Sequence, residues 1–202
     1  RTYMRLHDSY LSTCAKPREW QRLLYGMCLF HAVIQERRKF GPLGWNIRYD
    51  FTDGDLHVCN TQMRMFLDEY DEIPYKVIRV LSGEVNYGGR VTDSNDRRLI
   101  NNLLEVFIND SVMDENCTFS ESGTYKVPDN ANTVKGVLAT IKDLPLVPSP
   151  EVFGLHENAD ITCDQNETYT LFATVLSLQP RVSGGSGAKR ENVIAKVANE
   201  IL

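Results

Sequence analysis

Two helical patterns of the sequence meet at Glu84-Val85-Asn86-Tyr87-Gly88-Gly89-Arg90-Val91-Thr92-Asp93. The adjacent glycines allow either a positive φ or the close approach of another backbone segment. The arginine that follows them carries five N–H donors in a rigid plane and stays protonated. We therefore interpret the stretch as a turn that aims Arg90. A flexible hinge with a solvent-exposed arginine fits the same residues equally well, so the neighbouring sequence has to distinguish the two.

Apolar residues recur at helical spacing on both sides of this turn. The patterns predict four helices in the first half of the chain, over residues 17–39, 53–70, 74–83 and 94–107. Pro17 suits a first helical position, Gly41-Pro42 ends the first pattern, and Thr52 suits an N-cap. Thr92 or Ser94 can cap the fourth helix. Helices joined by short loops are expected to run antiparallel.

The loop between the first two helices, residues 41–51, has no helical or alternating period. It nevertheless carries four large apolar side chains, Trp45, Ile47, Tyr49 and Phe51. Such side chains are costly to leave in water. We therefore expect an ordered loop that packs all four of them against the helices.

Polar residues near these helices have ordinary structural interpretations. The basic triplet Arg37-Arg38-Lys39 is interpreted as the solvated end of the first helix, where cations interact favourably with the helix dipole. His31 lies on or beside the apolar stripe and is interpreted as a core histidine with a hydrogen-bond partner. The acidic residues between Asp68 and Glu72 lack the ligand spacing of a calcium loop. They are interpreted as a second solvated helix end.

The second half of the chain has a looser pattern. Residues 109–130 are polar and predict a loop with at most a short β element near 119–127, which Pro128 would stop. Apolar spacing from Val134 to Ile141 predicts a helix. The proline-punctuated segment 144–150 is extended by the same reasoning and is expected to separate two packing units, 1–147 and 148–202.

Beyond that segment we expect a helix carrying Leu171 and Phe172, a glycine-rich loop over residues 183–187 and a last helix over 189–202. The fold class is therefore mainly α: a helical bundle followed by a second helical unit. The chain begins without methionine inside a helical pattern and stops inside another. We expect it to be a fragment of a longer protein.

Composition limits the function classes. The 202 residues carry 22 basic and 27 acidic side chains, and no basic tract is longer than Arg37-Arg38-Lys39. Nucleic acid is therefore not expected as a partner. The five cysteines are odd in number and widely spaced, which is typical of reduced intracellular thiols. The sequence has no signal peptide or long apolar run, so no membrane partner is expected either.

The signatures of catalysis are missing from the sequence. The glycine-rich residues 183–187 are not completed to a phosphate-binding loop, and no cysteines or histidines stand at metal-ligand spacing. His156, Glu157 and Asp160 come nearest to a polar constellation, and we expect them to cap the following helix. An enzyme that uses His156 and nearby acids has no supporting spacing. The prediction is no catalytic residue, no metal site and no bound cofactor.

Three stretches nevertheless share a pattern with a known family. Residues 37–47, 83–93 and 150–161 resemble the dynein heavy chain near its C-terminus, in the same order and spacing, and the resemblance extends from about Lys16 to the end. The likeness to axonemal heavy chains is the strongest. Two positions depart from the family pattern, because Arg48 stands where proline is frequent and Asn95 stands where tryptophan is usual.

The resemblance implies that residues 1–147 are the helical lid subdomain of the sixth AAA+ module with a connecting segment. Residues 148–202 would then begin the C-terminal domain. It implies a non-catalytic part of a motor ring that transmits ATP-driven conformational change for microtubule-based ciliary movement. ATP and Mg²⁺ would belong to the parent motor, and microtubules would be reached only through it. The implied location is the cytoplasm and cytoskeleton, in the ciliary axoneme.

The resemblance also assigns candidate site residues. Residues 85–90 look like the sixth module's version of a lid motif, Tyr-Asp-Phe-Gly-x-Arg, with Arg90 in the place of the arginine that reaches nucleotide phosphates in other modules. The sixth module of the family is thought not to bind nucleotide, so we expect Arg90 to make a structural ion pair or helix-end contact at a module boundary. The predicted structural and interface residues are Trp45, Tyr87, Gly88, Gly89, Arg90, Phe153, His156 and Asn158.

Partners follow from the same resemblance. Neighbouring AAA+ modules and the remaining C-terminal domain are expected to meet exposed apolar surface on the loop 43–51 and on the helix 189–202. The alternative is a self-contained helical scaffold for protein interactions that shares only local motifs with the family. A self-contained scaffold should close its own core, whereas a fragment should leave apolar faces uncovered.

Overall fold

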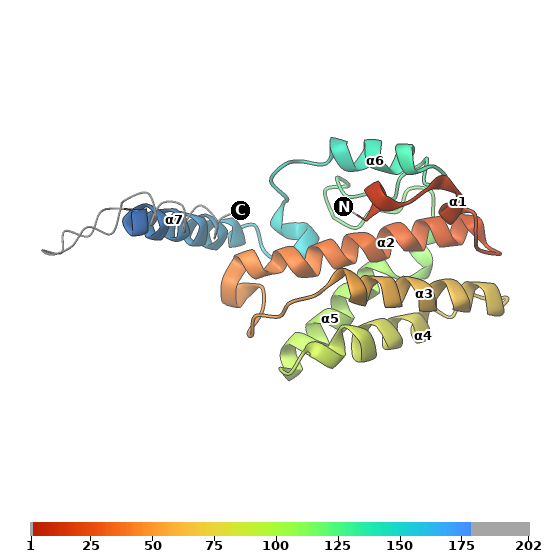
Figure 1. Cartoon of the computed structure of the whole chain (residues 1–202), viewed down its shortest axis with the longest axis horizontal. Coiled ribbons are helices and arrows are strands. Elements are labelled where there is room, and N and C mark those ends of the chain that lie inside the picture. The colour runs from red at the N-terminus through yellow and green to blue at the C-terminus, as the bar shows by residue number, and fades with distance from the viewer. Residues whose placement is uncertain (1, 179–202) are drawn as a thin grey trace, which may run out of the picture.

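The computed structural model describes residues 2–178 (Figure 1). Its α-helices are α1 (Asp8–Leu11), α2 (Pro17–Glu36), α3 (Asp53–Glu69), α4 (Tyr75–Val80), α5 (Ser94–Phe107), α6 (Val134–Asp143) and α7 (Ala159–Leu178). Short 3₁₀ turns are η1 (Tyr3–Arg5), η2 (Arg37–Leu43), η4 (Gly88–Arg90), η5 (Asp110–Met113) and η6 (Pro150–Phe153), and η3 (Leu81–Asn86) is a π-helical turn. The prediction of a mainly α fold is confirmed.

The bundle is built around α2. In Figure 1 it runs through the middle of the molecule, with α3, α4 and α5 on one side and α6 and the N-terminal segment on the other. Helix α2 is buried on several faces, and Trp20, Leu23, Leu24, Met27 and Phe30 are fully enclosed. Burial of apolar side chains such as these drives the folding of the bundle. The next helix along the chain, α3, runs antiparallel to α2 (Figure 1).

One N-cap is as expected from the sequence and another differs. Thr52 forms a capping box with Asp55, as its sequence position indicates. The N-cap of α5 is Asp93 rather than Thr92 or Ser94, because the Asp93 carboxylate accepts hydrogen bonds from the Asn95 and Asp96 backbone N–H groups at 2.9 and 3.0 Å.

The third predicted helix does not stop at residue 83. It continues as the π-helical turn η3 to Asn86, where the Tyr87 N–H donates to the Ser82 carbonyl at 2.9 Å. A π turn inserts an extra residue per turn and often lies at a special position of a fold. Here it leads directly into the central Gly-Gly-Arg turn.

Residues 108–158 wrap around the bundle with little regular structure. The β element predicted near 119–127 is a single antiparallel bridge between Thr118 and Lys126, and no strand is present in the part of the chain that the structure describes. The predicted helix over Val134–Ile141 is confirmed as α6.

The proline-rich segment is exposed at Leu146 and Val147, but the chain returns to the bundle immediately afterwards. Val152 and Phe153 of η6 are buried, and the Phe153 ring lies 5.0 Å from the Phe40 ring. The turn η6 thus belongs to the core of the bundle. The division at residue 147 into two units stays a prediction.

Helix α7 is confirmed by the structure. It contacts η2 and then extends away from the bundle (Figure 1). The predicted glycine-rich loop over 183–187 and the helix over 189–202 lie outside the described residues. Between residues 2 and 178, no helix has the length and apolar content that a bilayer-spanning helix needs.

Candidate functional site

The central turn is held by close backbone approach rather than by unusual dihedral angles. A Cβ built on Gly88 would lie 2.2 Å from the Gly83 carbonyl oxygen, which is far inside contact distance. Gly89 has no neighbour within 4 Å of the same position. Neither glycine has a positive φ. Of the two possibilities that the sequence offers for the glycine pair, the structure therefore shows close approach, and only Gly88 requires it.

Tyr87 fixes the turn to the core of the bundle. Its side chain is completely buried, and its hydroxyl shares a 2.9 Å hydrogen bond with His31 Nδ1. The ring makes edge-on contacts with Phe30 and Phe51 at 5.4 and 5.7 Å. A turn anchored in this way is a packed element and not a free hinge.

Arg90 points from the turn to the start of α3. Its Nε donates to Asp55 Oδ1 at 3.0 Å, and the arginine side chain stays 49% exposed while that of Asp55 is 11% exposed. The other oxygen of the same carboxylate accepts from the Thr52 backbone N–H at 2.8 Å. One carboxylate thus completes a helix cap and neutralises Arg90. The expected contact at a module boundary stays a prediction.

The loop after η2 is held by a carboxylate that the sequence analysis missed. Asp96 is 3% exposed and accepts hydrogen bonds from the Asn46 N–H at 3.1 Å, the Ile47 N–H at 3.2 Å and the Tyr49 hydroxyl at 3.0 Å. A carboxylate with three donors is stable in a buried position. The signal for it was the helical spacing of Asp96 to Ile100, which places it on the buried face of α5.

Three of the four aromatic and aliphatic side chains of this loop pack as expected. Trp45, Tyr49 and Phe51 are 4%, 8% and 6% exposed, and Trp45 Nε1 donates to the Ile34 carbonyl at 3.0 Å. Ile47 is 46% exposed, so the expectation that it packs inward is wrong. The Ile47 backbone N–H faces inward and donates to the buried Asp96 carboxylate, and the Ile47 side chain is left on the solvent side of the loop.

Arg37 corrects the interpretation of the basic triplet. It is 2% exposed, whereas its two basic neighbours are on the surface. Nε donates to the Gly44 carbonyl at 3.1 Å, Nη2 donates to the Leu43 carbonyl at 3.3 Å, and Nη1 donates to the Phe153 carbonyl. Its guanidinium also lies 5.5 Å from the centre of the Trp45 ring. The sequence signal was its spacing of three from the buried Ile34.

The remaining candidate residues lie apart from the central turn. Phe153 is buried against Phe40, while His156 and Asn158 are exposed in the loop before α7. His156 Nδ1 accepts from the Asn158 N–H at 3.2 Å, and its carbonyl accepts from the Ala159 N–H at 2.8 Å. His156 therefore contributes to the turn that starts α7. Between residues 2 and 178 no cluster of three metal-ligating side chains is present.

His31 should make stability depend on pH. Burial lowers its pKa below the ordinary value of 6.5, although the Asp53 and Asp55 carboxylates act in the opposite direction. Below the ordinary pKa the unfolded chain binds a proton that the folded chain refuses, so the free energy of unfolding falls as pH decreases. The wild-type free energy of unfolding should therefore be lower at about pH 5 than at about pH 7. We expect this difference in free energy to be smaller in His31→Gln, measured by urea denaturation at the two pH values. The control is His57→Gln on the exposed face of α3, which should leave this difference in free energy unchanged.

Comparison with known proteins agrees with this architecture. A model of the dynein heavy chain AAA lid domain matches residues 20–159. Dynein axonemal heavy chain 1 of Rattus norvegicus and of Homo sapiens are each 50% identical to the chain over 202 residues, covering 100% of it. Dynein axonemal heavy chain 3 of Homo sapiens is 46% identical over 193 residues, or 96% of the chain.

The chain is short compared with these relatives, since it spans 4% of the rat protein and 5% of the two human ones. The matched model extends from Trp20, inside α2, to the first residue of α7, and so it includes the central turn, the buried Arg37 and the Asp96 contacts. The chain therefore belongs to the dynein heavy chain AAA lid family.

Proposed function

We propose that this chain is the lid of the sixth AAA+ module of an axonemal dynein heavy chain, followed by the start of its C-terminal domain. It acts as a non-catalytic part of the motor ring that transmits ATP-driven conformational change for microtubule-based ciliary movement. Its location is then the cytoskeleton of the ciliary axoneme. Membership in the lid family and identity to axonemal heavy chains over the whole chain support this proposal.

One observation carries the proposal of a rigid transmitting unit. Three segments that leave the helices are each tied back to the bundle by a buried polar side chain. Arg37 binds the Leu43 carbonyl of η2 and the Phe153 carbonyl of η6, Asp96 binds the loop 46–49, and Tyr87 fixes the central turn to α2. A close-packed body whose loops are fixed in this way moves as a unit, because packed interiors deform little.

The partners proposed for this unit are the neighbouring AAA+ modules and the rest of the C-terminal domain. Leu43 and Ile47 are 51% and 46% exposed and offer an apolar surface at the edge of the bundle. Helix α7 exposes a second one, with Tyr169, Leu171, Phe172 and Leu176 all more than 60% accessible. Uncovered apolar faces of this kind favour a part of a larger assembly over the alternative, a self-contained interaction scaffold.

Nucleotide titration tests the non-catalytic part of the proposal. Arg90 is already neutralised by Asp55 within the same lid, so we expect no heat of binding when Mg-ATP or Mg-ADP is titrated into the chain, and no phosphate release. Arg90→Ala should behave as wild type in this calorimetry, and so should Arg98→Ala, which alters an exposed arginine of α5. Tight binding that disappears only in Arg90→Ala would show that the turn senses phosphate and would contradict the proposal.

A further inference from the structure

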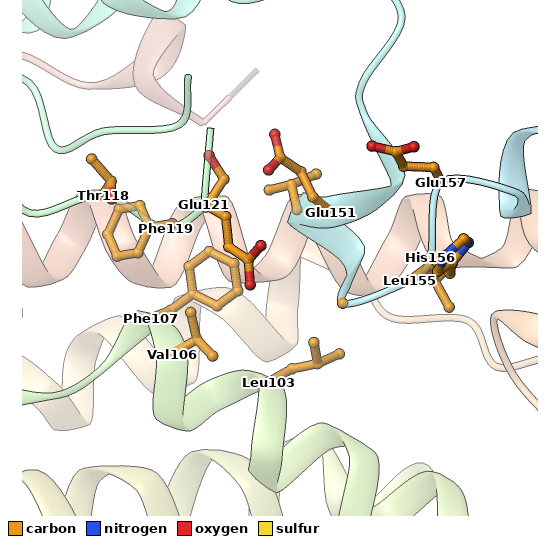
Figure 2. Close-up of a pocket in the computed structure, with 13 residues that line it drawn as sticks. Leu103, Val106, Phe107, Thr118, Phe119, Glu121, Glu151, Leu155, His156 and Glu157 are labelled. Atoms are coloured by element: carbon orange, nitrogen blue, oxygen red, sulfur yellow. The ribbon is translucent and has the colours of Figure 1, made fainter. Parts of the chain in front are cut away.

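A groove of about 980 Å³ lies between α5 and the segment from η6 to Glu157 (Figure 2). Leu103, Val106 and Phe107 of α5 form its apolar wall, and Phe119 adds a further aromatic ring. Val106 is 46% exposed, so apolar surface is open to solvent inside the groove. Exposed apolar surface in a concave site is typical of binding sites.

Gly154 keeps this groove open. Its φ of 65° is in the left-handed region, and a Cβ built there would lie 3.4 Å from Leu103 Cδ2. Glycine accepts this conformation without strain and adds no side chain over the apolar wall. The backbone can therefore end η6 and turn beside Leu103 without filling the groove.

The groove is also acidic. Glu121, Glu151 and Glu157 line it, and neither lysine nor arginine is among the lining residues. Within residues 2–178 none of these three carboxylates forms an ion pair. Glu151 accepts from the Ser122 N–H at 3.1 Å and from the Ser122 hydroxyl at 2.5 Å, which fixes the loop at Ser122 to η6. The other two are exposed and available to a partner.

We propose that this groove binds a basic, amphipathic segment of the same heavy chain, located outside these 202 residues. The occupant carries a large apolar side chain that covers Val106, and lysine residues that meet Glu121 and Glu157. Opposite charges around an apolar contact attract the segment to the groove and fix its alignment there. The same heavy chain is the source because this chain spans only 4–5% of its relatives, so most of the polypeptide lies outside it. The inference rests on the proposal that this chain is part of a longer heavy chain, but not on whether the lid transmits motion.

Zero-length carbodiimide crosslinking of the intact heavy chain tests this inference. The reagent joins a carboxylate to a lysine amine only where the two are in contact, and mass spectrometry then identifies the partner peptide. We expect Glu121 and Glu157 to crosslink to a lysine of the same heavy chain, beside large apolar residues. Val106→Ser keeps both carboxylates but removes apolar contact, so it should lower the crosslink yield about fivefold.

The matched control is Val58→Ser. Val58 is 44% exposed on α3 and does not line the groove, so the yield should stay at the wild-type value. Three results would overturn the inference: crosslinks only to a different protein, crosslinks only to lysines of these 202 residues, or no lysine crosslink at either glutamate. An equal yield in the two valine variants would overturn the apolar part of it.

Discussion

Arg37→Ala should lower the free energy of unfolding by about 4 kcal/mol, because it leaves buried hydrogen-bond acceptors without a donor. The Gly44, Leu43 and Phe153 carbonyls each accept from this guanidinium. Burial lowers the pKa of Arg37 to about 10, so the side chain remains a cation at neutral pH. The interaction joins η2 to η6 across more than a hundred residues of sequence. Loss of the side chain should therefore loosen η6 as well as η2.

Urea denaturation followed by far-UV circular dichroism measures this effect. Arg38→Ala is the matched control, since Arg38 is the exposed neighbour in the same basic triplet and should change stability by less than about 0.5 kcal/mol. Arg37→Lys should fall between the two, because an ammonium group cannot reach three separated carbonyls with the geometry of a guanidinium. Equal stability of the two alanine variants would mean that the buried contacts contribute nothing.

Gly88→Ala should have the second large effect, lowering the free energy of unfolding by about 3 kcal/mol through overpacking. The new Cβ would be 2.2 Å from the Gly83 carbonyl oxygen. No side-chain rotation can separate the two atoms, because the oxygen is part of the backbone and the Cβ is bonded directly to it. The turn can relieve this contact only by moving the chain between η3 and η4. Because Tyr87 is the preceding residue, that movement should also weaken its hydrogen bond to His31.

Gly89→Ala is the control for this prediction. The adjacent glycine has open space where the Cβ would lie and a negative φ, so alanine should be neutral or slightly stabilising there. Differential scanning calorimetry of both variants compares them directly. An equal change in stability in the two variants would show that the close approach of Gly88 to the Gly83 carbonyl does not constrain the turn.

The sequence was sufficient for those parts of the fold that depend on neighbours within a few residues. The spacing of apolar residues identified α2, α3, α5, α6 and α7, and the N-cap at Thr52 was visible from its place before the second helical pattern. The candidate residue Trp45 was found because a large aromatic side chain is costly to expose wherever it lies, whereas Tyr87 became a candidate only through the family resemblance. The Gly-Gly-Arg residues themselves predicted the central turn, but they did not indicate which of the two glycines is constrained.

By itself, therefore, the sequence determined the helices, their buried faces and the family. Only the tertiary structure decided which distant segments contact those buried faces. Spacing alone places Arg37 and Asp96 on buried stripes, but a buried charge is tolerated only if donors or acceptors converge on it. Those partners come from η2, η6 and the loop 46–49, which are distant in sequence and are brought together by packing. The same holds for Gly88, since the carbonyl that it must accommodate is placed there by a π turn that no local pattern predicts.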